Sequence, residues 1–395
     1  MNRVAIGHEW LTGMRGGEKV LDVLCERFPG AELFTLIHVK GSVSPAIERR
    51  PVHTSWLQHL PGNRQYYRQC LPLFPLLIEQ FDFDRFDLVL SSSHCVAKSV
   101  IVGPRAVHIC YCHTPMRYAW DQFDAYFGPE RLSRVSRAIL RPAMAALARW
   151  DRATSHRVHR YLTNSQHVAR RIGRYYNREA HVVYPPVDTE FFRPSASVPA
   201  STGSRAAPCG PESEPPRDGP HEKRCLIVSA LVPYKRLEIA IDACRLAGVP
   251  LTIVGGGPER TRLERTAVES GADVQFLGRL SDEDVREEYR RASLVLLPGE
   301  EDFGIAPLEA QACGRPVVAL GRGGAVESIV PGETGILVAE PDARAFATAV
   351  ADALNRRFDS DAIRRHAERF SRARFGDEIE TFVDDALSHP GFHAC

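Results

Sequence analysis

The sequence predicts an α/β protein made of two doubly wound, Rossmann-like domains that face each other across a cleft. The chain has 395 residues, which is more than a single hydrophobic core usually holds. Short apolar strands alternate with helical patterns in both halves. Between the halves, residues 195–224 are rich in Pro, Ser, Gly and charge, and they contain too few large apolar groups to form a core. We therefore expect a first domain over 1–194 and a second over 225–372, joined by a disordered insertion.

Composition excludes several classes of protein. Fifty basic and 49 acidic residues leave a net charge of +1, which disfavours a nucleic-acid-binding function for the chain as a whole. The ten cysteines include no Cys-x-x-Cys pair and fit a reducing compartment better than a disulfide framework. The N-terminus reads as a strand rather than a signal peptide, and no apolar run approaches the roughly 20 residues of a membrane-spanning helix. We expect a protein that is cytoplasmic or peripheral to a membrane.

The first domain is expected to begin with a strand over residues 3–7, a glycine-rich turn containing Gly16 and Gly17, and a helix over 18–28. A strand, a glycine turn and a helix in this order form the phosphate-binding arrangement of doubly wound folds, although a plain tight turn explains the two glycines equally well. No P-loop motif occurs. The apolar pattern predicts further strands over 33–38, 87–91, 106–112 and 182–188.

His113 follows directly after the strand predicted over 106–112. Open α/β sheets bind ligands at the carboxyl ends of their strands, so His113 is a candidate ligand contact, with a packing or capping role as the alternative. His108, Cys110 and Cys112 would share one face of that strand. A metal site is one interpretation of these side chains, but cysteines in a buried strand are usually small core residues, and we expect no metal.

The second domain is expected to start with a strand over 225–231 and a helix over 237–247. Lys235 lies between them, where it would be well placed to bind a phosphate, or would simply be solvated. After the strand from Leu251, Arg260 stands where a Gly-x-Gly-x-x-Gly motif needs its last glycine, which disfavours a nicotinamide dehydrogenase. Further strands are predicted over 274–277, 294–297, 317–320 and 334–338.

The stretch 298–316 carries the most chemistry. Pro307 suits the first position of a helix, which we expect over 307–313. Glu309 would then lie in the first turn, near free N–H groups that favour an anion, and Glu301 lies on the preceding loop. Two carboxylates and an uncapped helix N-terminus indicate a ligand that has both hydroxyls and phosphates, such as a nucleotide sugar. The alternative is an ordinary strand, loop and helix with solvated acids.

The same residues resemble a known family. Glu301-Asp-Phe-Gly-Ile-Ala-Pro-Leu-Glu309 is similar to the donor-site signature of the family-four retaining glycosyltransferases, which have the GT-B fold. The version Pro298-Gly-Glu-Glu-Asp-Phe-Gly304 resembles that of bacterial mannosyltransferases of surface polysaccharide and O-antigen biosynthesis. His113-Thr-Pro-Met-Arg117 and Pro185-Pro-Val-Asp188 resemble two further motifs of the family. The resemblance covers nearly the whole chain apart from 195–224.

This resemblance implies a reaction and a set of site residues. The reaction would move a hexose, expected to be mannose from GDP-mannose, to a sugar carried on a polyprenyl diphosphate, with retention and without a divalent metal or other cofactor. Glu301, Lys235 and His113 would be the catalytic residues: Lys235 would bind the diphosphate, while Glu301 and His113 would contact the sugar. The residues expected to bind the donor are Gly16, Gly17, Lys235, Arg236, Gly278, Arg279, Leu280, Phe303, Gly304, Ile305, Leu308 and Glu309.

The chain also departs from the family pattern. Ala230 stands where the family often has a basic residue, so a second cation for the diphosphate would have to come from Arg236 or from an arginine of the first domain. The insertion 195–224 is longer than the family leads us to expect, and its role is open. Residues 373–395 are expected to form a helix that crosses back to the first domain, as in this fold generally.

Residues 131–174 contain 11 arginines and one aspartate. A solvated helical face accounts for most of them. A patch of one sign would also attract anionic lipid head groups, as a family member acting on a lipid-linked acceptor at the inner face of the plasma membrane would need. Three alternatives to the mannosyl reaction stay open: transfer from a UDP-sugar, epimerisation of a nucleotide sugar, and non-catalytic binding of a nucleotide sugar.

Overall fold

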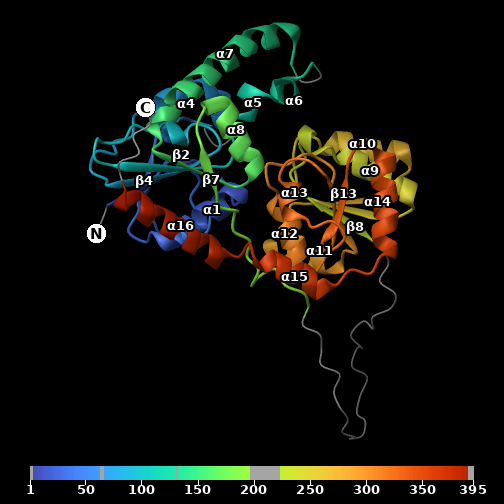
Figure 1. The fold of residues 1–395 in the computed structure, drawn as a ribbon. Coiled ribbons are helices and arrows are strands. Elements are labelled where there is room, and N and C mark those ends of the chain that lie inside the picture. The colour runs from blue at the N-terminus through green and yellow to red at the C-terminus, as the bar shows by residue number, and fades with distance from the viewer. Residues whose placement is uncertain (1–2, 63–65, 130–131, 196–222, 390–395) are drawn as a thin grey trace, which may run out of the picture.

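The structure is a computed structural model that describes residues 3–62, 66–129, 132–195 and 223–389. It contains two parallel β-sheets, one in each half of the chain, with helices on both faces of each sheet (Figure 1). The predicted pair of doubly wound α/β domains is therefore confirmed. Most of the predicted insertion, 196–222, lies outside the described residues.

The first sheet has the strand order β3-β2-β1-β4-β5-β6-β7, and all of its neighbouring strands run parallel. The order of the strands reverses between the neighbouring strands β1 and β4, and the carboxyl ends of strands at such a switch point form a natural ligand site. The strands are β1 Val4–Leu11, β2 Glu32–His38, β3 Val52–Thr54, β4 Leu88–Ser93, β5 Val107–Cys112, β6 Arg160–Thr163 and β7 Ala180–Val182.

Strand β1 runs four residues further than predicted. His8 pairs with Thr35 and Trp10 with Ile37 of β2, so part of the predicted glycine-rich turn is a buried strand. The following helix begins at Gly16. The helices of this half are α1 Gly16–Arg27, α2 Pro45–Glu48, α4 Phe74–Ile78, α5 Arg117–Trp120, α6 Phe123–Phe127, α7 Arg134–Ala153 and α8 Gln166–Tyr176, with 3₁₀ turns at Trp56–His59, Tyr67–Leu73, Ala97–Ser99 and Thr154–Arg157.

The second sheet repeats this plan with the order β10-β9-β8-β11-β12-β13, and its switch point lies between β8 and β11. Its strands are β8 Cys225–Val228, β9 Leu251–Val254, β10 Val274–Gly278, β11 Leu294–Leu297, β12 Val317–Leu320 and β13 Gly335–Val338. Its helices are α9 Leu237–Ala247, α10 Arg260–Ser270, α11 Asp282–Arg291, α12 Ile305–Ala312, α13 Ala325–Ser328, α14 Ala343–Asn355 and α15 Ser360–Glu368, with a 3₁₀ turn at Pro233–Lys235.

Two segments connect the halves. The strand predicted over 182–188 is wrong beyond Val182, where β7 ends. Val187 instead donates its N–H to the carbonyl of Phe370, which follows α15. The last helix, α16 Arg372–Ser388, follows the second domain in sequence but lies against the first (Figure 1). Its Phe375 and Ile379 join the apolar cluster of the first sheet. In the part of the chain that the structure describes, no helix is long and apolar enough to cross a membrane.

Candidate functional site

The loop from β11 to α12 carries the two glutamates of the predicted site. Gly304 has φ +88°, a conformation that glycine adopts easily, and it turns the chain into the helix two residues earlier than predicted. Helix α12 therefore begins at Ile305, with Pro307 in its first turn, where proline costs no hydrogen bond. The predicted start at Pro307 is wrong, and Glu309 lies in the second turn rather than the first. Both Glu301 and Glu309 are buried.

Lys235 and Glu301 form an ion pair inside the second domain. Gly299 makes the contact between their loops possible, because a Cβ there would lie 2.5 Å from the Tyr234 carbonyl oxygen. Burial, followed by the positive charge of Arg117, lowers the pKa of Lys235 to about 7. Asp302 is the anionic group that raises the pKa of Lys235 against these two effects, and a bound diphosphate would raise it further.

Glu309 is held from both domains. Lys19, on α1 of the first domain, donates from Nζ to Oε1 of Glu309 at 2.5 Å. Tyr289, buried on α11, donates its hydroxyl to Oε2 at 3.1 Å. A carboxylate fixed by two donors keeps a defined orientation, as recognition of a pair of hydroxyls requires.

A second ion pair crosses the domains next to Glu301. Arg117, at the start of α5, contacts the carboxylate of Asp302, and both side chains are nearly buried. Burial alone would raise the pKa of Asp302, but Arg117 and then Arg171 outweigh it and lower the pKa. The Arg117 guanidinium also lies 4.9 Å from the ring centroid of Tyr234, beside Lys235. The first domain thus places a second cation near the Lys235 turn.

The first domain supplies the opposite wall from the start of α1. A Cβ at Gly16 would lie 3.3 Å from Cδ1 of Ile305, so the two helix N-termini meet across the domains. A Cβ at Gly17 would lie 3.7 Å from Nε2 of His113. The structure therefore brings Gly16, Gly17, His113 and Ile305 together.

His113 is fixed in a neutral form. Its backbone N–H donates to Ser93, its carbonyl accepts from the Asn164 side chain, and Nε2 lies 2.9 Å from the Ser92 hydroxyl. Burial, then the positive charges of His94 and His8, lower the pKa of His113 to about 3. A neutral imidazole exchanges hydrogen bonds with a sugar hydroxyl without attracting the diphosphate.

Other predicted contacts lie at the edge of this arrangement. Arg236 adopts φ +52°, and its half-exposed side chain is directed at Glu238 rather than at the glutamates of the motif. The side chains of Phe303 and Leu308 belong to an apolar cluster with Val187 and Phe370, so neither side chain is directed at a ligand.

The turn predicted against the donor base lies at the end of β10. Gly278 has φ +73° and its carbonyl accepts the N–H of Gly255. The Arg279 side chain lies near Gly256, and Leu280 packs against a core cluster of the second domain. This turn therefore faces the glycine-rich loop after β9. Of the three predicted residues, only Arg279 has a charged side chain, and that side chain lies against this loop.

The residues considered for a metal site have other partners. His108 lies 2.9 Å from the Ser91 hydroxyl through Nε2 and 3.0 Å from the Arg157 carbonyl through Nδ1. Cys110 and Cys112 are buried in the core. Within the described ranges, no group of three or more His, Cys, Asp or Glu side chains is arranged to hold a metal ion.

Sequence reasoning missed three side chains that join the domains at this site: Lys19, Arg117 and Asp302. Arg117 ends the motif that starts at His113, and Asp302 lies in the motif that starts at Glu301. Their places in these motifs could have marked both as site residues. Lys19 gave no such signal, because its partner Glu309 is 290 residues away in the sequence.

Two family models match the chain, one on each side of the insertion. The model described as Glycosyltransferase Family 4 matches residues 14–191, and the model described as Glycosyl transferases group 1 matches residues 213–373. Among curated proteins, a D-inositol 3-phosphate glycosyltransferase of Mycobacteroides abscessus is 33% identical over 221 residues, covering 52% of this chain and 46% of that protein. The Mycolicibacterium smegmatis protein of the same name is 33% identical over 218 residues, with 52% and 48% covered. The chain thus spans about half the length of these relatives.

Solved structures match over nearly the full chain. HepE of Anabaena in complex with UDP-glucose has a TM-score of 0.67 at 17% identity, covering 97% of this chain and 99% of that one. The lipopolysaccharide outer core galactosyltransferase WaaB has a TM-score of 0.62 at 16% identity, with 97% and 99% covered. At these identities the likeness establishes the fold, which is GT-B, as the sequence predicted.

Proposed function

We propose that this chain, which has the GT-B fold and matches a glycosyltransferase model in each half, is a retaining glycosyltransferase that takes a hexose from a nucleotide diphosphate sugar. The observation that carries the proposal is the contact between Lys235 and Glu301 beside the N-terminus of α12. A cation and free helix N–H groups suit a diphosphate, and the buried carboxylates Glu301 and Glu309 suit hydroxyls. His113 approaches from the other domain.

In the proposed reaction, the bond between the sugar and the diphosphate breaks and negative charge develops on the leaving phosphate. Lys235 and the N–H groups at the start of α12 stabilise that charge, and preorganised electrostatics of this kind is usually the largest catalytic contribution. Glu301 and His113 orient the sugar, and Glu309 holds the ribose hydroxyls. The acceptor attacks the face from which the leaving group departs, so the anomeric configuration is retained.

Arg117 is the proposed second cation for the diphosphate. The family position at Ala230 is apolar, and Arg236 is directed at Glu238. Arg117 lies beside the Tyr234–Lys235 turn, and its charge reaches Lys235 strongly enough to lower the lysine pKa. Two cations in this position would do the work for which other transferases use a divalent metal, so we propose a metal-independent enzyme.

GDP-mannose is the proposed donor, on the strength of the Pro298-to-Gly304 motif. A UDP-hexose is the second candidate, because HepE of Anabaena, which shares the fold, is solved in complex with UDP and UDP-glucose. The two bases differ in their hydrogen-bonding edges, and the turn at Gly278 with Arg279 is the proposed place where the protein distinguishes them.

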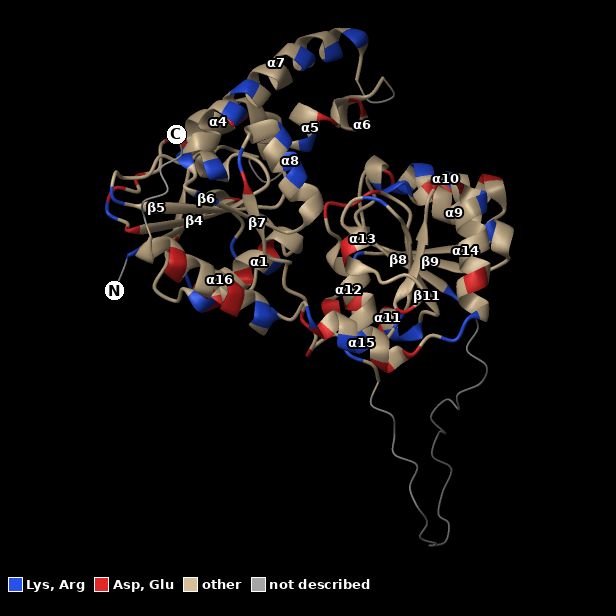
Figure 2. Ribbon diagram, viewed as in Figure 1, with Lys and Arg blue, Asp and Glu red and all other residues tan. Residues whose placement is uncertain are grey.

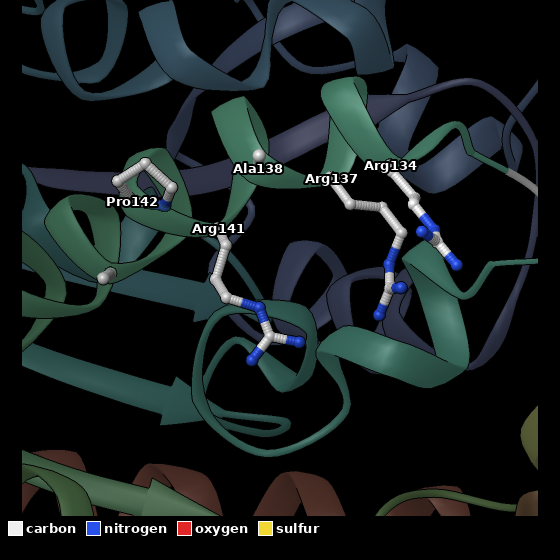
Figure 3. Close-up of a pocket in the computed structure, with 6 residues that line it drawn as sticks. Arg134, Arg137, Ala138, Arg141 and Pro142 are labelled. Carbon is white, nitrogen blue, oxygen red and sulfur yellow. The ribbon is translucent and has the colours of Figure 1, made fainter.

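The proposed acceptor is a sugar on a polyprenyl diphosphate, presented at an anionic membrane surface. Helix α7 projects beyond the rest of the first domain and carries several arginines along its length (Figure 2). Arg134, Arg137 and Arg141 line an open groove of about 500 Å³ and leave the helix on the same side (Figure 3). The intervening Val135 and Ile139 are 70% and 68% exposed.

Helical spacing places Val135 and Ile139 on one face, beside the face that carries the three arginines. A basic face next to an exposed apolar face is the pattern of a helix that lies in a membrane interface. The arginines are not all free, since Arg137 and Arg141 both pair with Asp124. We infer that the first half of α7, rather than the whole of 131–174, docks on the membrane.

The proposed function is tested by offering GDP-mannose or UDP-glucose with octyl glycosides as acceptors and following the product by NMR. Formation of an octyl disaccharide with the donor's anomeric configuration supports a retaining transferase. Release of a free epimerised sugar would replace it with an epimerase, and donor binding without any turnover would replace it with a binding protein.

A further inference from the structure

A second cluster of ionisable side chains lies at the carboxyl edge of the first sheet, outside the predicted site. Glu9 of β1 is fully buried and its Oε1 accepts four hydrogen bonds, from the Ser93 hydroxyl and from the N–H groups of His94, Cys95 and Ala97. These four donors stabilise the ionised carboxylate in the core and hold it in one position. Glu9 therefore presents a fixed negative charge through its other oxygen.

His94 is the residue in contact with that second oxygen of Glu9. Its Nδ1 lies 3.1 Å from Oε2 of Glu9, while its side chain remains 32% exposed. Trp10 lies edge-on to the imidazole, with 4.7 Å between ring centroids, and limits its rotation. Because Nδ1 is turned toward Glu9, Nε2 is the ring nitrogen on the side away from the carboxylate. A carboxylate that holds the far nitrogen of an accessible histidine is the usual arrangement for a proton-accepting imidazole.

His94 lies close to the first-domain residues of the candidate site. Its ring centroid lies 6.3 Å from that of His113, and His113 in turn lies beside Gly17. Gly16, next along α1, contacts Ile305 of the second domain. These contacts run from His94 through His113 and the start of α1 to Ile305 of the donor motif. A group beyond the sugar-contacting histidine, on the first-domain side, is where an acceptor hydroxyl would approach.

We propose that His94, held by Glu9, accepts the proton of the attacking hydroxyl; this inference rests on the proposed function. The acceptor O–H bond breaks and its proton moves to Nε2. The bond between the anomeric carbon and the phosphate oxygen breaks, and its electron pair leaves with the nucleotide diphosphate. The acceptor oxygen bonds to the anomeric carbon, and the imidazolium later releases its proton to solvent.

The surroundings of His94 set the pH at which it acts. Burial alone would lower the pKa of His94, but the Glu9 carboxylate outweighs burial and raises it. A base must be neutral to act, so turnover should rise with pH through a pKa above the ordinary 6.5 of histidine. The other titratable or charged groups near His94 are His8, Arg15, Glu18 and His113.

The test separates donor binding from turnover, and uses water as the acceptor so that no acceptor need be known. Donor Kd and the rate of donor hydrolysis are measured for the wild type, His94→Gln and the matched control His53→Gln, with GDP-mannose and with UDP-glucose. His53 is a suitable control because its Nε2 lies 2.7 Å from Glu32 at the far edge of the same sheet. We expect His94→Gln to keep the wild-type Kd and lose about 10²-fold or more in rate, and to lose the acid limb of the pH profile.

A His94→Gln variant that hydrolyses donor at the wild-type rate, with an unchanged pH profile, would overturn the role of His94 and leave the proposed function standing. A wild type that binds neither nucleotide sugar, or binds and never hydrolyses or transfers, would overturn the proposed function and with it this inference. His94 is about one-third exposed, and the glutamine amide of the variant still offers a donor to Glu9, so the variant should fold. Its Tm, compared with that of His53→Gln, checks this.

Discussion

Lys19 on α1 and Glu309 on α12 form an ion pair between the two domains, with 2.5 Å between Nζ and Oε1. The pair joins the glycine-rich helix start of the first domain to the acid that we expect to bind the ribose. Tyr289 holds the other oxygen of the same carboxylate. The contact between the two domains therefore helps to fix the orientation of Glu309.

Replacing Glu309 by glutamine should weaken donor binding. The amide keeps the shape of the side chain but removes the charge that strengthens hydrogen bonds to hydroxyls, which are worth about 1.5–3 kcal/mol each when charged. We expect the donor Kd to rise about tenfold or more, as measured by calorimetry. Glu340→Gln is the control, since Glu340 is exposed and pairs with the half-exposed Arg322. Unchanged donor affinity and rate would remove Glu309 from the site.

Replacing Lys235 by alanine should lower kcat by about 10²-fold or more, because Lys235 is proposed to stabilise charge that develops in the transition state. Steady-state kinetics with the best donor measures this. Lys223→Ala, at an exposed lysine near the start of the second domain, serves as the control. A rise in KM with kcat intact would instead assign Lys235 to ground-state binding.

The buried pair of Arg117 and Asp302 should make stability depend on pH. The pKa of Asp302 is lower in the folded protein, so its contribution is present above the unfolded value of about 3.9 and is lost as pH falls through the folded value. Asp302→Asn leaves Arg117 unpaired and should cost about 3–5 kcal/mol at neutral pH. We expect the Tm difference between wild type and variant to shrink as the pH falls from 5 to 3. A constant difference would contradict this assignment.

The exposed apolar residues of α7 should decide membrane binding. Val135→Ser with Ile139→Ser should reduce co-sedimentation with vesicles that contain phosphatidylglycerol, because both side chains would otherwise enter the interface. Val268→Ser is the matched control, since Val268 is 82% exposed on the second domain. Binding that is equally strong to neutral phosphatidylcholine vesicles, or unaffected by the double substitution, would remove α7 as the docking surface.

The sequence predicted the alternation of elements well because buried parallel strands and amphipathic helices leave strong local patterns. Helix α9 begins and ends at the predicted residues. The start of α12 was wrong by two residues, because proline marks a permitted position in the first turn while Gly304, in a left-handed conformation, determines where the chain turns. The residue type at Pro307 carries no information about the backbone dihedral angles of Gly304.

The motif acids were recognisable, but their partners were not. Lys19 meets Glu309, and Arg117 meets Asp302, only because two separately folded domains come together. The role inferred for His94 was also hidden, since its partner Glu9 lies 85 residues earlier on another strand, within a stretch that reads as a turn. Contacts of this kind depend on how the strands and domains are arranged in space, and the local pattern of apolar residues does not specify that arrangement.

The central claim is that the cleft binds a nucleotide sugar and activates it without a metal. Thermal stabilisation and hydrolysis should be compared for GDP-mannose, UDP-glucose, UDP-N-acetylglucosamine and GDP-fucose, each with and without a chelator. We expect stabilisation and turnover with GDP-mannose, unaffected by the chelator. A response to a uridine donor instead would keep the mechanism and replace the mannosyl assignment, and no response to any of the four would contradict the account.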